Sequence, residues 1–221
     1  TATEPPTHTE TGGASLGLRV PAVVFAMTIV AAGLGFIFGA FDLSVVAFAE
    51  EQGSQASAGI MIALLSAGSL AGALVYGARQ WATPLWKRTL ALTVLLAVAV
   101  LALALAPNLW WMGAIGLVAG ATIAPNLTNA DSIVQRVVKP DQITEGMAWL
   151  RIGMGVGVAA GGWVAGALID AMGARAGLLT SASGGLLVVI AAFSAISVVR
   201  TVPEEPTDEP EVPEDLSTVP R

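Results

Sequence analysis

The sequence predicts an all-α membrane protein, and three observations support that fold class. The chain of 221 residues is 55% hydrophobic and only 12% charged, whereas a soluble domain is typically about 25% charged. Apolar runs of about 20 residues, the length that crosses a bilayer, follow one another along the chain. The runs are apolar on all sides and lack the polar stripe of an amphipathic soluble helix. We therefore expect a bundle of six transmembrane helices.

The six expected spans are bounded by charges, prolines and glycines. They cover residues 20–48, 57–79, 87–106, 109–137, 143–170 and 174–200. The third is the clearest, because Thr89 to Ala106 contains neither a charge nor a glycine. The first and fourth are longer than a bilayer requires, so they should tilt, kink or project, and Pro125 is expected to kink the fourth.

Outside the spans, the sequence predicts a disordered leader at 1–18 and a disordered tail at 201–221, around a bundle at 19–200. Both segments are polar and rich in proline. The tail holds seven acidic residues against Arg221, so the net charge of −6 belongs to the tail and the bundle is neutral. We expect both segments to be cytoplasmic.

Several function classes are excluded by what the chain lacks. No cluster of Lys and Arg forms a phosphate-binding surface, so nucleic acid is not an expected partner. The chain has no cysteine, and its one histidine, His8, lies in the leader. Disulfides, thiolate zinc sites and histidine-centred catalytic triads therefore have no residues to build on. We expect no enzyme activity, no metal and no cofactor.

The basic residues predict the orientation of the bundle. If the first span starts in the cytoplasm, the inner ends and loops hold Arg19, Arg79, Lys87, Arg88, Arg136, Lys139 and Arg200, and the outer loops hold only Arg175. The positive-inside rule then places both termini in the cytoplasm. Trp81 and Trp86 mark the inner interface, and Trp110 and Trp111 mark the outer one.

Two similar segments close the second and fifth spans and predict an internal repeat. Residues 71–79 read AGALVYGAR, and residues 165–175 read AGALIDAMGAR. The two spans run in opposite directions, as a 3+3 inverted repeat requires. Both also carry glycines at four-residue spacing, which lets helix backbones approach closely in lipid. These glycines are Gly68 and Gly72 in the second span and Gly157, Gly161, Gly162 and Gly166 in the fifth.

The order of these motifs resembles a known family. The segments are GSLAGALVYG at 68–77 followed by Lys87 and Arg88, APN at 124–126, TEGMAW at 144–149, and the run from Gly166 through Asp170 and Gly173 to Arg175. In this order the chain is similar to the carboxyl-terminal six-helix half of the major facilitator superfamily, and most similar to bacterial drug-efflux-type proton antiporters.

The resemblance implies half of an alternating-access transporter in a bacterial plasma membrane, exporting small amphipathic solutes with proton coupling. The family's loop motif fits Gly166, Asp170, Gly173 and Arg175, but in the outer loop; in the inner loop, Tyr76 stands where the family has aspartate. Such transporters have twelve helices. We therefore expect a piece of a longer chain or a half-size protein that needs a partner. The expected partners are an amino-terminal six-helix half, a second copy or a larger membrane complex, and the last would make the chain a non-transporting accessory subunit.

Ionisable residues inside spans are candidates for function because they are costly in lipid. Asp42 lies roughly 33 Å along the first helix, beside Phe41, and is expected either to carry protons or substrate or to be a wetted acid at the helix end. Arg151 is expected to snorkel to the interface or to pair with Glu145 or Asp131. Asp131 and Arg136 are expected to be a solvated or structural pair.

Two amides complete the set of candidate residues. Asn126 and Asn129 lie three residues apart and so share one helix face. Pro125 frees a carbonyl one turn earlier. The amides are expected either to line a polar cavity or to join neighbouring helices by hydrogen bonds.

Overall fold

The structure, a computed structural model, describes residues 22–54 and 56–200, which form helices joined by short turns and loops and contain no strand. Its long helices start and end close to the expected spans. They are α1 (Ala22–Glu51), α2 (Ala56–Gly77), α3 (Leu85–Ala104), α4 (Leu109–Val137), α5 (Ile143–Met172) and α6 (Ala174–Val199), with a short 3₁₀ turn, η1 (Pro140–Gln142), before α5. The leader at 1–18 and the tail at 201–221, expected to be disordered, lie outside the described residues.

Five of these helices are long and apolar enough to cross a membrane: α1, α2, α3, α5 together with η1, and α6. The exception is α4, which is long enough but whose second half is polar. Asn126, Thr128, Asn129 and Asp131 follow one another there. Crossing of the membrane by α4 stays a prediction.

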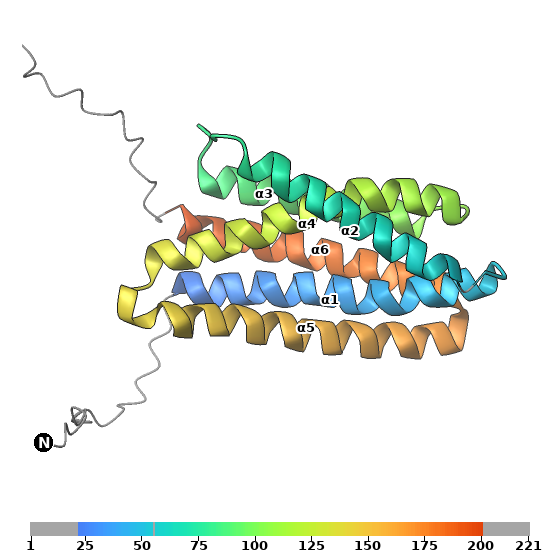
Figure 1. Cartoon of the computed structure of the whole chain (residues 1–221). Coiled ribbons are helices and arrows are strands. Elements are labelled where there is room, and N and C mark those ends of the chain that lie inside the picture. The colour runs from blue at the N-terminus through green and yellow to red at the C-terminus, as the bar shows by residue number, and fades with distance from the viewer. Residues whose placement is uncertain (1–21, 55, 201–221) are drawn as a thin grey trace, which may run out of the picture.

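The helices form two pairs joined by a central layer (Figure 1). α1 packs along α5, and α2 packs along α4. α6 and α3 pack against each other and connect the pairs, since α6 also contacts α1 and α3 also contacts α4. The start of α1 and the end of α6 lie at the same end of the bundle. We call this the basic end, because Arg79, Lys87, Arg88, Arg136, Lys139 and Arg200 flank the helix termini there.

Glycines bring α1 and α5 into backbone contact. A side chain at Gly157 would overlap the carbonyl oxygen of Ala32, and one at Gly161 would overlap that of Phe36. In return, a side chain at Gly35 of α1 would meet the carbonyl oxygen of Met154. Packing at this separation gives dispersion contacts and Cα–H···O contacts that larger residues would prevent.

α2 and α4 meet through glycines in the same pattern. A side chain at Gly68 would overlap the carbonyl oxygen of Leu117, and one at Gly72 would overlap that of Ala121. From the other side, a side chain at Gly120 would overlap the carbonyl oxygen of Leu65. The carbonyl of Ala121 lacks its usual helical partner because residue 125 is proline. Pro125 therefore leaves this oxygen free to face Gly72, and α4 continues through the proline.

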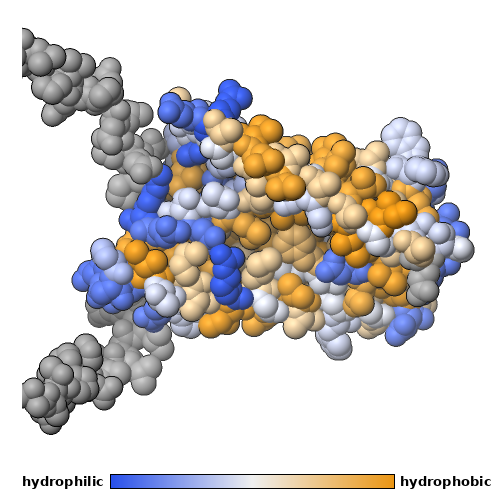
Figure 2. Space-filling model, viewed as in Figure 1, coloured by the Kyte–Doolittle hydropathy of each residue, from blue (hydrophilic) through white to orange (hydrophobic). Residues whose placement is uncertain are grey.

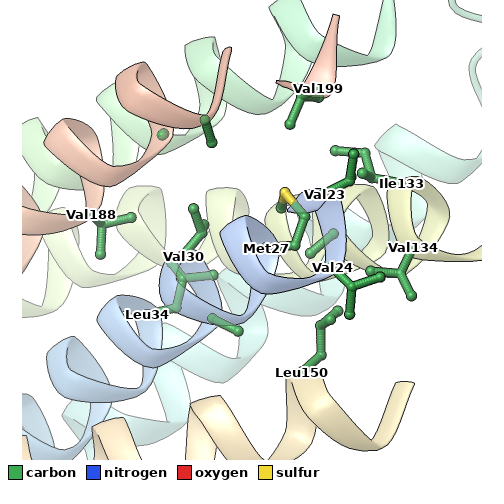
Figure 3. Close-up of a cluster of buried hydrophobic side chains, with 14 of the residues drawn as sticks. Val23, Val24, Met27, Val30, Leu34, Ile133, Val134, Leu150, Val188 and Val199 are labelled. Carbon is green, nitrogen blue, oxygen red and sulfur yellow. The ribbon is translucent and has the colours of Figure 1, made fainter. Parts of the chain in front are cut away.

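The core between the helix layers is apolar. Figure 3 shows its larger cluster, where Val24, Met27 and Val30 of α1 meet Ile133 of α4 and Leu150 of α5. A second cluster fills the other half of the bundle and includes Phe41, Phe48, Met61, Leu103, Met112 and Leu178. On the face shown in Figure 2 much of the exposed surface is also apolar, and most of the hydrophilic side chains lie toward the two ends. This distribution fits a bundle surrounded by lipid.

Candidate functional site

The candidate site lies where α1 and α4 face each other between the two helix pairs. These helices contact each other only over a short length. Phe38 of α1 and Ile123 of α4 line one small cavity of about 10 Å³ there. Side chains four residues apart share a helix face, so the same face carries Asp42 on α1 and Leu127 and Asp131 on α4. We call these residues the α1–α4 face.

Each half of this face carries one carboxylate. α1 starts at the basic end and α4 finishes there, so the two helices are antiparallel. Asp42 lies about 6 Å beyond Phe38, away from the basic end, and Asp131 lies about 12 Å beyond Ile123, toward it. The apolar cavity between Phe38 and Ile123 therefore separates two acids by roughly 18 Å along the bundle.

Asp131 binds Arg151 of α5, which is one of the two pairings expected for this arginine. The Nη2 atom of Arg151 lies 2.8 Å from Oδ2 and 3.1 Å from Oδ1 of Asp131. The Arg151 side chain is 54% exposed and that of Asp131 is 25% exposed. The pair neutralises both charges and joins the α2–α4 pair to the α1–α5 pair near the basic end.

Asp42 differs from Asp131 because its carboxylate has no hydrogen bond or ion pair with any described residue. It is exposed on the surface of the bundle, whereas Phe41, the neighbouring candidate, is only 4% exposed and lies in the core. Phe41 lines the same small cavity as Phe38 and Ile123, and it does so from the core of the bundle. The two candidates thus point to different environments.

Asn126 joins α4 to α3. Its Nδ2 donates to the carbonyl oxygen of Thr122 over 2.9 Å, and the Thr93 hydroxyl of α3 lies 3.0 Å from its Oδ1. The Thr93 hydroxyl also lies 2.8 Å from the carbonyl oxygen of Thr89, so its one hydrogen is shared. This is the interhelix role, and Asn126 is 3% exposed.

Asn129 joins α4 to α2 through Tyr76. The Tyr76 hydroxyl donates to Oδ1 of Asn129 over 2.6 Å and accepts from Nη1 of Arg88 over 3.0 Å. Trp81 stacks on the Tyr76 ring at 4.9 Å between centroids, and its Nε1 donates to the Tyr76 carbonyl. Asn129 Nδ2 and Arg88 Nε are buried and without a partner among the described residues. Tyr76 thus connects Asn129 of α4 to Arg88 of α3 through its one hydroxyl group.

Substituting Tyr76 by phenylalanine should lower the stability of the bundle. The change removes one hydroxyl and leaves the buried Asn129 with neither amide atom bonded. The expected loss is about 1 kcal/mol, measured as the free energy of unfolding in mixed micelles. Thr128→Val is the matched control, since it removes an exposed hydroxyl that bonds only to its own helix. Equal losses in the two variants would contradict the role given to Tyr76.

At the end of the bundle that lies opposite the basic end, hydrogen bonds connect helix ends to neighbouring turns. Glu51, at the end of α1, accepts a hydrogen bond of 2.7 Å from the backbone N–H of Ala174, where α6 starts. Gly173 before it has φ of 86°, a conformation that other residues rarely adopt. Arg175 donates to the carbonyl oxygen of Ala106 over 3.3 Å and lies over the Phe48 ring. Gly173 and Arg175 therefore fix the turn between α5 and α6.

The remaining motif residues have simpler surroundings. Asp170 is exposed near the end of α5, and Gly166 makes only an ordinary contact with Leu43. The sequence indicated Asp131–Arg151, and the structure adds Tyr76, Arg88, Thr93 and Glu51. Of these four, Tyr76 and Arg88 had a sequence signal, namely their places in the inner-loop motif. Among the residues that the structure describes, no group of His, Asp and Glu could hold a metal ion.

Comparison with known proteins gives one match. A family model described as Major Facilitator Superfamily matches residues 13–220. No curated protein and no solved structure matches the chain. The family model covers all six long helices.

Proposed function

The chain belongs to the major facilitator superfamily, and on this basis we propose that it is the carboxyl-terminal half of a proton-coupled transporter that exports small amphipathic solutes. The observation that carries this proposal is the α1–α4 face. It offers an apolar stretch around Phe38 and Ile123 with one carboxylate on either side. An amphipathic solute fits such a surface, because most of its contact is apolar and a carboxylate can neutralise its charge.

Matched packing in the two helix pairs supports the internal repeat that many alternating-access transporters contain. The contact of Gly68 with Leu117 corresponds to that of Gly157 with Ala32, and the contact of Gly72 with Ala121 corresponds to that of Gly161 with Phe36. We propose that this correspondence is the trace of a 3+3 inverted repeat, in which α1 is equivalent to α4 and α2 to α5. Each tight glycine-mediated pair then contains one helix from each repeat.

The similarity between residues 71–79 and 165–175 is out of register with this repeat. That similarity aligns Gly72 with Gly166, whereas the packing aligns Gly72 with Gly161. Gly166 makes no close approach to α1. The two segments resemble each other because each precedes a turn at a helix end, and α5 continues further past its packed glycines than α2 does.

The Asp131–Arg151 pair supports a gate at the basic end. It connects the two helix pairs beside the α1–α4 face, and both side chains remain accessible to solvent. A partly exposed ion pair contributes little stability, about 0–1 kcal/mol. Such a pair can open and close without a large energetic barrier from its own contacts. From the positive-inside rule we propose that this gate faces the cytoplasm.

Solute flux tests this proposal. The full chain is purified with its bound partners from the membrane, reconstituted into vesicles and loaded with a fluorescent amphipathic cation. We expect export that depends on an imposed pH gradient and stops when a protonophore collapses it. A stable complex with a protein of another class, together with no flux from correctly folded protein, would favour the accessory subunit and refute the transporter. The accessory subunit is the second candidate. It is favoured by the scarcity of groups for proton coupling, because on the α1–α4 face Asp42 alone has no partner among the described residues.

A further inference from the structure

A long apolar groove lies between α3 and α6, away from the α1–α4 face. Its volume is about 450 Å³. Val94, Val98 and Leu101 of α3 and Leu186 and Val189 of α6 line it. The hydroxyl of Ser183, which also lines it, donates to the carbonyl oxygen of Thr180 and is therefore satisfied within its own helix. The groove offers no hydrogen-bonding partner and suits a hydrocarbon chain.

Two cations lie at the basic end of the same helix pair. Lys87 is in the first turn of α3, and Arg200 directly follows α6. Both contact the Trp86 ring, with Nζ of Lys87 at 5.3 Å and Cζ of Arg200 at 4.3 Å from its centroid. Neither has an acidic partner among the described residues. Trp86 therefore brings together two positive charges that no described acid neutralises.

Helical spacing places the cations in line with the groove. Lys87, Val94 and Leu101 recur every seven residues, which is two turns, and so share one face of α3. Leu186, Phe193 and Arg200 recur in the same way on α6, where Phe193 is 54% exposed. The apolar face of the two helices thus continues from the groove to the pair of cations.

This face is long enough to extend through one leaflet of a bilayer. Fourteen residues separate Lys87 from Leu101, which is about 21 Å along the helix. The hydrocarbon of one leaflet is about 15 Å thick, half of the bilayer core. A headgroup at Lys87 and Arg200 would therefore place its acyl chains alongside the groove.

We propose that the α3–α6 face binds an anionic phospholipid, with its phosphate at Lys87 and Arg200 and one acyl chain in the groove. Trp86 contacts both cations and keeps them at the level of the lipid headgroups, because tryptophan side chains favour the membrane–water interface. The two charges attract the phosphate and the apolar groove orders the chain. This binding is independent of the transport proposed above, since no residue of the α1–α4 face takes part.

Native mass spectrometry of the full chain in detergent tests the proposal, with phosphatidylglycerol and phosphatidylcholine titrated separately. We expect the parent chain to bind phosphatidylglycerol more tightly. The double variant Lys87→Gln/Arg200→Gln should weaken that binding at least about tenfold and leave phosphatidylcholine binding unchanged. The control double variant Arg79→Gln/Lys139→Gln removes two cations at the same end but away from α3–α6, and it should keep the parent affinity.

The groove is tested separately by filling it. Val98→Trp should weaken binding of both lipids, whereas Val156→Trp on the exposed surface of α5 should not. All of the substituted side chains lie at the surface, and equal thermal midpoints show that the fold is retained. Equal affinity of the parent for the two lipids, equal losses in the two double variants, or unchanged binding after Val98→Trp would each overturn the proposed site.

Discussion

Replacing Gly157 by alanine is expected to destabilise the bundle more than any other single methyl group added to α5. The new Cβ would overlap the carbonyl oxygen of Ala32 and approach the backbone nitrogen of Phe36. Backbone atoms cannot turn aside as a side-chain tip can, so α1 and α5 must separate along their length. Overpacking of this kind costs about 1–3 kcal/mol, and the close contacts made by Gly161 and Gly35 weaken as well.

The chain offers a matched control on the same helix. Gly155 is exposed, and a Cβ there would meet nothing within 4 Å. Gly155→Ala makes the same chemical change and should leave stability equal or raise it by about 0.5–1 kcal/mol, because alanine is the better helix former. The two alanine variants should therefore differ in sign. Unfolding free energy in mixed micelles and the yield of monodisperse protein are the measurements.

The second helix pair extends this prediction to the proposed repeat. Gly68→Ala meets the Leu117 carbonyl of α4, while Gly59→Ala on the same helix meets nothing. If the two pairs are equivalent units, the losses at Gly68 and Gly157 should be similar. Four variants of equal stability would show that the helices do not pack through these glycines. A loss at only one of the two positions would contradict the equivalence of the pairs.

The positions of the helices could be predicted from the sequence, because each helix depends on the composition of its own segment. Hydrophobic runs and the residues that interrupt them predicted 109–137, and α4 spans Leu109–Val137. The α5–α6 turn was equally local, since Gly173 adopts a positive φ between two apolar runs. Such features need no knowledge of which helices become neighbours.

The contacts between helices were harder to predict from the sequence, because the fold brings together residues that lie far apart along the chain. Asn129 was identified as a buried amide, but its partner Tyr76 lies 53 residues earlier on another helix. Glu51 was not among the candidate residues, and its bond to Ala174 crosses 123 residues. Sequence similarity and helix packing also give different registers for the proposed repeat, because the similar segments lie at turns and the packed glycines lie inside the helices. Arg151 was the exception, since Asp131 was one of few acids near enough to pair with it.

Replacing Asp42 by asparagine is expected to uncouple the proposed solute export from the pH gradient. On the α1–α4 face this carboxylate alone has no partner among the described residues, whereas Asp131 is held by Arg151. A proton can drive a conformational change only by binding the two conformations with different affinity. Asparagine keeps the shape of the protonated acid and removes its titration. Export driven by a pH gradient should fall roughly 5–150-fold, the usual range of a coupling energy between two sites.

Exchange of labelled solute without a pH gradient distinguishes coupling from binding. It should persist in Asp42→Asn, because the apolar stretch around Phe38 and Ile123 is unchanged. Asp141→Asn, in the exposed turn between α4 and α5, makes the same chemical change away from this face and should retain full pH-driven export. Unchanged pH-driven export in Asp42→Asn would remove Asp42 from the mechanism. If exchange is lost while stability is unaltered, Asp42 instead binds the solute. A residue that only carries protons is not needed for exchange when no pH gradient is applied.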